Sequence, residues 1–319
     1  MDTAVTVTTY TRLLRQSFAR FPHVLRIFER LTELMDTGCD QEQEPDWILI
    51  LGEPGTGKTT LLKVYVKLHP RIEHETFTEV PVLYVEIPQK CSTSDLVGAI
   101  LLALGSPLWN KGSEAQRTHQ LVVLLKECKV RLVILDEINH LIDRGKERTH
   151  YLAGDCLKVL SGLSRVPFAL AGIPRSRALI DANEQLADRA GEVILIEVFS
   201  ADKSSTQPIG AALNVFKRAL KGLPTVDITH ATMERTIAFA TGGRLRSMRR
   251  LLVRAVEIAF RKPVPKIGID VLSQAFLEVI FPKAPPTRNP FSRKFNKTPL
   301  IKAGEPFAPR RQGGRNAGH

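Results

Sequence analysis

The chain lacks several patterns that mark secreted, metal-binding or membrane proteins. Its four cysteines lie far apart and form no C-x-x-C pair, which argues against a zinc site and a disulfide framework. The longest apolar run, Leu96 to Leu104, is far shorter than the roughly 20 residues that a membrane-spanning helix needs. The N-terminus has no apolar signal-peptide core, and no internal repeat is present. These absences predict a protein of the reducing cytoplasm without a membrane partner.

Acidic residues are scarce at one end of the chain. The 319 residues carry a net charge of +12, and +8 of it lies in residues 282–319, where Glu305 is the only acidic residue. This segment also contains seven prolines, so we expect a basic tail that is disordered or docks on a partner. Contact with phosphates or an acidic protein and a merely solubilising role both remain open.

The most informative stretch is "LGEPGTGKTTLLK", from Leu51 to Lys63, which matches the phosphate-loop pattern G-x-x-x-x-G-K-[ST]. In this pattern the glycines let main-chain N–H groups surround phosphates, Lys58 supplies positive charge to the β- and γ-phosphates, and Thr59 offers a hydroxyl to Mg²⁺. A strand before the loop and a helix after it are the required context, and the sequence predicts both. The predicted nucleotide-binding residues of the loop are Gly52, Glu53, Pro54, Gly55, Thr56, Gly57, Lys58, Thr59 and Thr60.

An acidic motif later in the chain supplies the carboxylates that this chemistry needs. In "RLVILDEINHL" four apolar residues, Leu132 to Leu135, predict a buried strand that ends in Asp136 and Glu137. At the carboxyl edge of a parallel sheet Asp136 would hold Mg²⁺ through its hydration shell, and Glu137 would orient the attacking water. ATP and Mg²⁺ are therefore the predicted substrate and metal ion.

The pattern of strands and helices predicts the fold class. Five apolar runs alternate with helical sequence, as in a parallel sheet flanked by helices: Trp47–Leu51, Val80–Ile87, Val130–Leu135, Val166–Ala171 and Glu192–Val198. After about Ser200 only helical patterns follow, which predicts a small all-helical lid. The predicted regions are an N-terminal helical segment with a connector (1–46), an α/β ATPase core (47–199), the lid (200–281) and the basic tail (282–319).

This order of motifs resembles that of the AAA+ ATPases, and more closely that of the TniB/TnsC family of transposition ATPases. The segments that carry the closer resemblance are "VPVLYVEIPQKCSTSDLVGAILLALGSP", "VRLVILDEINHLI" and "VPFALAGIPRSRALIDANEQLADR". The resemblance spans roughly Glu44 to Phe281. It implies a five-stranded AAA+ phosphate-loop core, a helical lid and subunits that assemble into a ring or a helical filament.

The resemblance also implies roles for residues outside the two motifs. Arg189 matches the arginine finger that reaches a neighbouring subunit's γ-phosphate, which makes it catalytic together with Lys58 and Glu137. In "GGRLRSMRR", Gly243 and Arg246 match the sensor-2 pattern, with Arg244 as a near-equal alternative. The polar sensor-1 residue is missing, because "AGIP" places Ile173 and Pro174 at that point. Its role could pass to Arg175 or Ser176 or be absent, and absence would slow hydrolysis or make it depend on a partner.

Candidate DNA contacts come from basic residues. The resemblance places Lys111 near a loop that faces duplex DNA, with Lys90 or Arg117 in support, and such contacts would tolerate any sequence. The row of Arg246, Arg250 and Arg254 on a lid helix is better explained as a solvated face. Basic patches interleaved with aromatic residues favour binding of single-stranded nucleic acid, and the sequence contains no such patch.

The leading prediction is an ATP-dependent transposition protein that assembles on duplex target DNA, recruits or regulates a transposase or targeting adaptor, and disassembles on hydrolysis. An alternative in the same superfamily is a replication initiator or helicase loader, although the residues after Phe281 are too basic, Pro-rich and short for its usual winged-helix domain. A second alternative is an interaction switch that binds ATP and hydrolyses little of it.

Overall fold

Two compact units make up the chain in the computed structural model, which describes residues 6–37, 44–142, 147–181, 190–202, 205 and 207–309. Residues 20–196 form the sheet unit, and residues 1–19 and 197–319 form the helical unit. The helices of the predicted N-terminal segment therefore fall into different units: α1 (Val7–Gln16) belongs to the helical unit and α2 (Pro22–Thr37) to the sheet unit.

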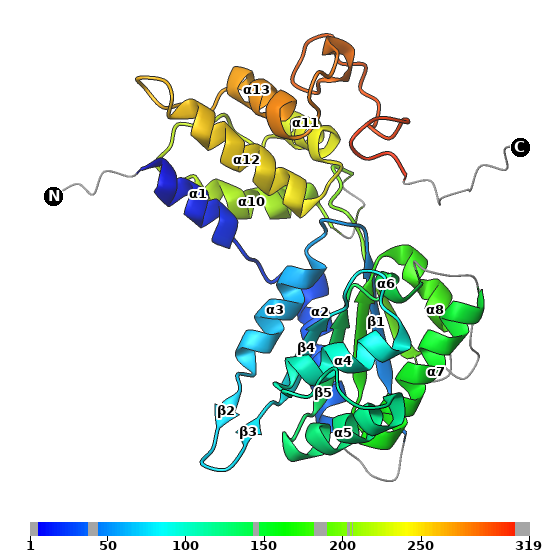
Figure 1. Cartoon of the computed structure of the whole chain (residues 1–319). Coiled ribbons are helices and arrows are strands. Elements are labelled where there is room, and N and C mark those ends of the chain that lie inside the picture. The colour runs from blue at the N-terminus through cyan, green and yellow to red at the C-terminus, as the bar shows by residue number, and fades with distance from the viewer. Residues whose placement is uncertain are drawn as a thin grey trace, which may run out of the picture. The chain divides into compact units, whose positions relative to one another are not determined.

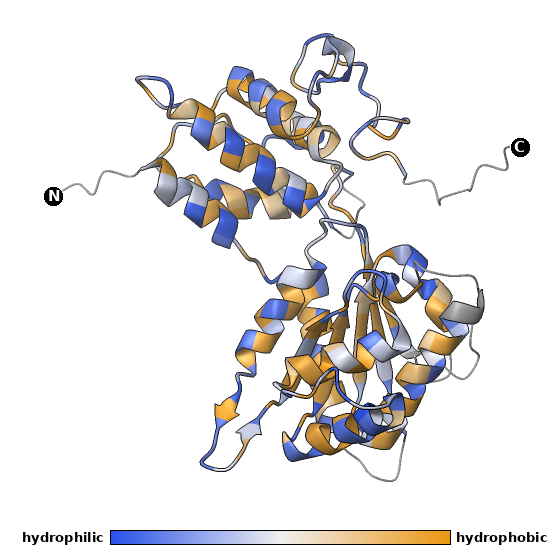
Figure 2. Ribbon diagram, viewed as in Figure 1, coloured by the Kyte–Doolittle hydropathy of each residue, from blue (hydrophilic) through white to orange (hydrophobic). Residues whose placement is uncertain are grey.

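The sheet unit is built on a five-stranded parallel sheet, as predicted (Figure 1). Its strand order is β4-β5-β6-β1-β7, with β1 at Trp47–Gly52, β4 at Val82–Glu86, β5 at Leu132–Asp136, β6 at Phe168–Gly172 and β7 at Ala190–Ile196. Every residue of β1, β5 and β6 is buried, because helices cover both faces of the central strands. These strands appear as continuous apolar segments in Figure 2.

Helices follow the strands in the alternation that a parallel sheet requires. Those of the sheet unit after α2 are α3 (Lys58–Leu68), α4 (Thr93–Ala103), α5 (Glu114–Glu127), α6 (Asn139–Ile142), α7 (Glu147–Ser164), the 3₁₀ turn η1 (Pro174–Arg177) and α8 (Ala178–Asp181). The starts of α4 and α5 are fixed by capping boxes at Ser92 and Ser113. In the core Trp47 stacks on Phe168, with ring centroids 5.6 Å apart, and its indole N–H donates to Ser161 Oγ at 3.0 Å.

A short antiparallel hairpin between α3 and β4 did not follow from the sequence. Its strands, β2 (Ile72–Glu73) and β3 (Thr78–Glu79), have two residues each, which is too short to give an alternating pattern. The His74 and Phe77 rings stack at its turn, 4.4 Å apart.

The helical unit contains α1 and four later helices: α10 (Ile209–Ala219), α11 (Ala231–Thr241), α12 (Leu245–Ala259) and α13 (Ile269–Val279). Helix α12 is the centre of the unit and packs against α1, α11 and α13. Its buried face includes Met248, Leu252 and Ala255, at the three- and four-residue spacing of one helix face. Helix α1 is held by Tyr10, whose hydroxyl donates to the Lys221 carbonyl at 3.4 Å.

The basic segment after α13, expected to be disordered or to dock on a partner, is packed within its described residues, up to 309. Arg288, in the 3₁₀ turn η2 (Pro286–Arg288), is buried and donates to both carboxylate oxygens of Glu305, at 2.6 and 2.7 Å. Its guanidinium also reaches the Pro299 carbonyl at 2.7 Å, and Leu300 is buried beside this segment's turns. One arginine thus satisfies acceptors from a Pro-rich segment whose described regular structure is the short turn η2. Residues 310–319 lie outside the described part.

Among the described residues, no helix is long and apolar enough to cross a membrane.

Candidate nucleotide-binding site

The phosphate loop connects β1 to α3 at the carboxyl edge of the sheet. Gly55 and Gly57 have φ values of 88° and 106°, a left-handed conformation that side-chain-bearing residues rarely adopt. Helix α3 begins directly after Gly57, and no side chain caps its first N–H groups. The loop is braced from within, because Thr56 Oγ1 donates to the Glu53 carbonyl at 2.9 Å. The uncapped amides at a helix N-terminus form the cradle that an anion such as phosphate fits.

Lys58 is buried at the first position of α3, with 5% of its surface exposed. Its ammonium donates to the Gly52 carbonyl at 2.6 Å and the Glu53 carbonyl at 3.3 Å, so the cation lies against the loop rather than in solvent. Thr59 is half-buried in the same helical turn, while Glu53, Pro54 and Thr60 are exposed. The predicted residues of this loop are thus brought together at one helix end.

Asp136 lies at the same edge of the sheet, at the carboxyl end of β5. Its side chain is fully buried, and its carboxylate accepts hydrogen bonds from the Tyr84 hydroxyl and the Glu137 N–H, both at 2.9 Å. No group of three or more His, Cys, Asp or Glu that could hold a metal occurs within the described ranges. One carboxylate and one threonine hydroxyl fit Mg²⁺, which keeps most of its ligands as water and substrate phosphate.

Glu137 follows Asp136 with a φ of 60°, a left-handed conformation that is uncommon outside glycine. The residue is half-buried, and within the described structure no side-chain hydrogen bond engages its carboxylate. Its neighbour His140 has a structural contact instead, since Nδ1 donates to the Ile87 carbonyl at 2.8 Å. The backbone therefore changes direction at the residue predicted to orient water.

Tyr84 is a member of the site that the sequence did not indicate. It lies on β4, two residues before the Glu86 that pairs with Asp136 in the sheet register. Burial, reinforced by the Asp136 charge, raises the pKa of its phenol, which stays a neutral donor. A polar aromatic in an otherwise apolar strand was the available signal, but only the strand pairing shows which carboxylate it reaches.

Strand β6 lies between β5 and β1 in the sheet. Its carboxyl end leads into the segment where the sensor-1 residue is missing. Of the two substitutes considered, Arg175 is exposed, whereas Ser176 is completely buried against Gly172. Ser176 Oγ and Asn139 Oδ1 have no hydrogen-bond partner among the described residues. They belong to η1 and α6, which pack against each other. Buried polar atoms without partners are costly, so these two are candidates for ligand or water contact.

The sensor-2 motif lies in the helical unit. Gly243 has a φ of 65°, and its carbonyl accepts a hydrogen bond from the Phe199 N–H at 2.9 Å. A Cβ at this position would lie 1.9 Å from the Phe199 carbonyl oxygen. Only glycine fits this main-chain contact. Arg246 is exposed in the first turn of α12, whereas the guanidinium of Arg244 lies over the Phe307 ring, 4.8 Å from its centroid. The predicted arginine finger, Arg189, lies outside the described residues.

The three candidate DNA contacts differ in their surroundings. Lys90, between β4 and α4, and Lys111, between α4 and α5, are exposed on separate loops. Arg117 is engaged inside the fold, where its guanidinium donates to Ser94 Oγ and to the Ser94 carbonyl at 3.3 Å. This contact ties α5 to the first turn of α4. Arg117 is thus less available for phosphate than the two lysines.

Comparison with protein families gives a match to the model described as the bacterial TniB protein, over residues 9–197. This match covers more than half of the chain. The chain belongs to the TniB family. It is therefore a transposition-associated AAA+ protein, and its sheet order is typical of AAA+ proteins. Comparison with curated proteins finds no match.

Solved structures of AAA+ proteins resemble the fold. The Cdc6 protein of Pyrobaculum aerophilum is 20% identical, with a TM-score of 0.61 over 86% of this chain and 72% of that chain. The ORC2 protein of Aeropyrum pernix, solved as ADPNP–ADP complexes, is 16% identical, with a TM-score of 0.60 over 84% and 71%. The ORC1 protein of the same organism, solved in complex with DNA, is 18% identical, with a TM-score of 0.58 over 84% and 69%. At these identities the similarity concerns the fold alone.

Proposed function

We propose that this TniB-family protein is an ATPase that assembles on duplex target DNA and recruits or regulates a transposase. The observation that carries the proposal is one sheet edge that presents the phosphate loop with buried Lys58 and the adjacent acidic pair Asp136 and Glu137. Backbone amides, a cation, a metal-binding carboxylate and a water-orienting carboxylate are the groups that phosphoryl transfer to water requires.

Each residue has a defined task in this proposal. Lys58 and the amides of the loop hold the phosphates of ATP, while Thr59 and Asp136 hold the hydrated Mg²⁺ that neutralises phosphate charge. Tyr84 fixes the rotamer of Asp136 through its 2.9 Å hydrogen bond. Glu137 orients the attacking water, and its Oε atoms accept the proton. Arg189 of a neighbouring subunit and Arg246 of the lid bind the γ-phosphate, so its loss weakens the assembly.

The DNA-bound state would rest on contacts to the phosphate backbone. Lys111, with Lys90 as a second contact, gives binding that is insensitive to sequence and sensitive to salt. The assembled subunits, as a ring or a helical filament, would present a platform to a transposase or targeting adaptor. Hydrolysis of ATP would then release the subunits from DNA.

The first experiment is electron microscopy of the protein with duplex DNA and a non-hydrolysable ATP analogue. Nucleotide-dependent rings or filaments are expected for the wild type and for Arg131→Ala, a control that removes an exposed arginine at the opposite end of β5. They should be absent for Arg189→Ala. If no assembly forms on any duplex, the transposition platform is wrong and the isolated switch is favoured.

A second measurement addresses the DNA contact. The affinity for duplex is measured against salt concentration for Lys111→Ala and for Lys126→Ala, which removes an exposed lysine of the last turn of α5. We expect Lys111→Ala to lower the slope of log K against log salt by about 1, as for one lost phosphate contact. Equal slopes for both variants would remove Lys111 from the DNA interface.

The switch with little hydrolysis is the second candidate, favoured by Ile173 and Pro174 at the sensor-1 position. Measuring ATP turnover with and without DNA separates the two. Stimulation by DNA supports the regulated ATPase, whereas negligible turnover under every condition supports the switch.

A further inference from the structure

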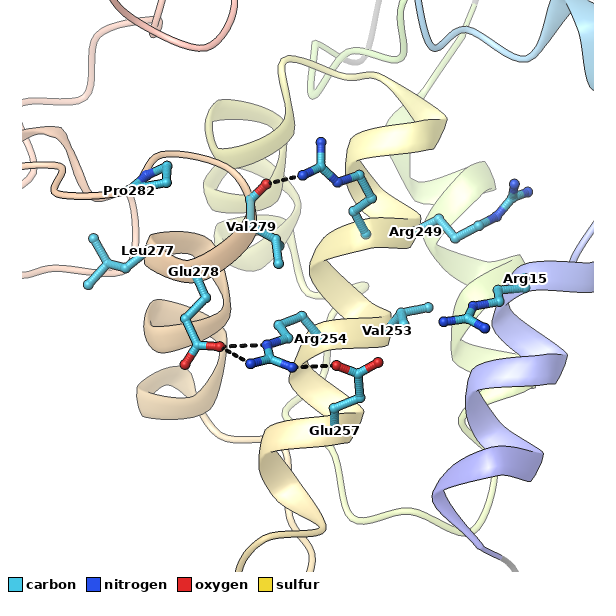
Figure 3. Close-up of a pocket in the computed structure, with 10 residues that line it drawn as sticks. Arg15, Arg249, Val253, Arg254, Glu257, Leu277, Glu278, Val279 and Pro282 are labelled. Carbon is cyan, nitrogen blue, oxygen red and sulfur yellow. Dashed lines mark hydrogen bonds and ion pairs between the residues drawn. The ribbon is translucent and has the colours of Figure 1, made fainter.

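An arginine-lined cavity lies in the helical unit, whereas the phosphate loop and the acidic pair belong to the sheet unit. Its volume is about 700 Å³, and its walls come from α1, α12, α13 and Pro282 (Figure 3). Four arginines and two glutamates line it, together with apolar side chains that include Val253 and Leu277. The charged lining therefore carries a net +2, and the remaining lining residues are apolar.

Half of the arginines are engaged by α13 and α12 themselves. Arg254 donates to Glu278, at 2.5 Å, and to Glu257, at 2.6 Å, so its charge is neutralised. Arg250 donates to the main-chain carbonyl of Val279 at 2.7 Å, at the carboxyl end of α13. Figure 3 shows Arg254 between Glu278 of α13 and Glu257 of α12.

Together with Arg250, the other two arginines supply the excess positive charge. Arg249 donates to the Ser17 carbonyl at 3.1 Å, but its buried Nε has no partner within the described residues. Burial lowers the pKa of its guanidinium. Arg15 is exposed, comes from α1 and points toward Val253 (Figure 3). No ion pair in the described structure joins either guanidinium to a carboxylate, so both remain open to an anion.

We propose that this cavity binds an acidic–apolar peptide segment of a partner protein, with a carboxylate on Arg249 and Arg15 and an apolar side chain over Val253 and Leu277. Binding of the peptide requires neither nucleotide nor DNA and does not depend on the proposed function. The positive charge of the lining is complementary to a carboxylate, and the apolar lining residues suit an apolar side chain next to that carboxylate. Buried anchors in such pockets supply most of the binding energy of an interface.

Two other occupants fit the cavity less well. Duplex DNA is a broad, rigid polyanion, and a concave site that contains Glu257 and Glu278 presents negative charge to its phosphates. The end of this chain, residues 310–319, contains three arginines and no acidic residue, so its charge has the same sign as that of the cavity.

The test uses a phage-displayed library of random heptapeptides selected on the full chain, with counter-selection on the Arg15→Gln/Arg249→Gln variant. We expect selected peptides to carry Asp or Glu beside an apolar residue. The best peptide is then labelled, and its Kd is measured by fluorescence anisotropy. Arg15→Gln alone, at an exposed position, guards against a misfolded double variant, and circular dichroism checks each variant.

Variants that remove arginines and variants that remove glutamates from the cavity should change the Kd of the peptide in opposite directions. The Kd should rise about tenfold or more in the double variant and several-fold in Arg15→Gln, because charge-assisted hydrogen bonds are lost. The Kd should fall in Glu278→Gln, which removes one of the two carboxylates on Arg254. It should stay unchanged in Arg218→Gln, which removes an exposed arginine of α10 outside the cavity. The proposal is overturned if no peptide is enriched over the counter-selection, if all variants bind alike, or if a short duplex displaces the peptide and binds through Arg15 and Arg249 itself.

Discussion

Two regions of this protein bury a positive charge, and they use it differently. At the sheet edge Lys58 donates to main-chain carbonyls of a glycine-rich loop, next to a helix end whose N–H groups have no side-chain cap. In the segment after α13 Arg288 is enclosed by the Glu305 carboxylate, the Asn296 side chain and the Pro299 carbonyl. The first arrangement leaves donors available to a ligand, whereas the second is complete within the fold.

The polar atoms around each cation follow the same division. Near the phosphate loop Ser176 Oγ and Asn139 Oδ1 are buried and have no partner in the described residues. Near Arg288, Asn289 donates to Ser273 Oγ at 2.8 Å and accepts from the Phe291 N–H at 3.0 Å. Buried polar groups that the fold satisfies contribute to stability, and those it leaves over indicate where a ligand or water binds.

The largest expected effect is on catalysis. In Glu137→Gln, ATP affinity should persist because Lys58 and the loop are intact, while hydrolysis should fall about 10²–10⁴-fold because the general base is lost. Turnover of radiolabelled ATP and equilibrium binding measure the two quantities. Glu127→Gln, at the end of α5, is the control. A turnover close to that of the wild type would show that another residue orients the water.

The next effect is on stability. Arg288→Met deprives the largely buried Glu305 carboxylate of its guanidinium partner and leaves it only the Lys302 N–H, at 2.8 Å. We expect the free energy of unfolding to fall by about 3–5 kcal/mol. Both tryptophans, Trp47 and Trp109, lie in the sheet unit, so circular dichroism rather than fluorescence should register the loss. Lys302→Met, at an exposed position of the same segment, should change it by less than about 0.5 kcal/mol. Equal effects of the two variants would mean that Arg288 does not organise this segment.

Lys58→Ala should weaken ATP binding rather than stability, in contrast to Arg288→Met. Loss of one charge-assisted contact to phosphate weakens ATP binding by about 1.5–3 kcal/mol, or roughly ten- to a hundredfold, while stability is retained. Calorimetric titration with ATP and urea unfolding provide both numbers. Lys63→Ala, on the exposed face of α3 beside Glu86, is the matched control and should bind ATP normally. A strong loss of stability in Lys58→Ala would make its role structural, like that of Arg288.

The smallest effect concerns pH. The hydrogen bonds from Arg288 hold the pKa of Glu305 below its usual value. A carboxyl with a lowered pKa stabilises the fold above its unfolded-state pKa, about 4.3, and this contribution is lost as the pH falls through the folded-state value. Urea unfolding between pH 5 and pH 3, conditions chosen around that pKa, should therefore show a smaller loss of stability for Glu305→Gln than for the wild type. Equal pH profiles would contradict this assignment.

Much of the sheet unit could be predicted from local sequence. The five strands are confirmed because buried parallel strands are continuous apolar runs, and the phosphate loop is marked by glycines at fixed spacing. The hairpin of β2 and β3 was missed because two-residue strands carry no periodicity. Tyr84 was missed because its partner, Asp136, is 52 residues away and is brought near only by the sheet register.

The helical unit shows the limits of composition. A high content of proline and basic residues predicted a tail that is disordered or docks on a partner, whereas in its described part Arg288 and Glu305, 17 residues apart, close a packed loop. The N-terminal helices look like one segment, yet α1 packs on α12 while α2 belongs to the sheet unit. In the sheet unit, Arg117 was predicted as a supporting DNA contact, but its guanidinium donates to Ser94 within the fold.

The sequence by itself determined the parallel α/β core, the phosphate loop and the acidic pair at the end of β5, because each depends on residues that are close together in the chain. The tertiary structure alone decided which charges are satisfied within the fold. It paired Arg288 with Glu305 and Arg254 with Glu278, and it left Ser176 and Arg249 with open hydrogen-bonding capacity among the described residues. The physical reason is that burial and hydrogen bonding depend on neighbours distant in sequence, and only folding brings those neighbours within reach.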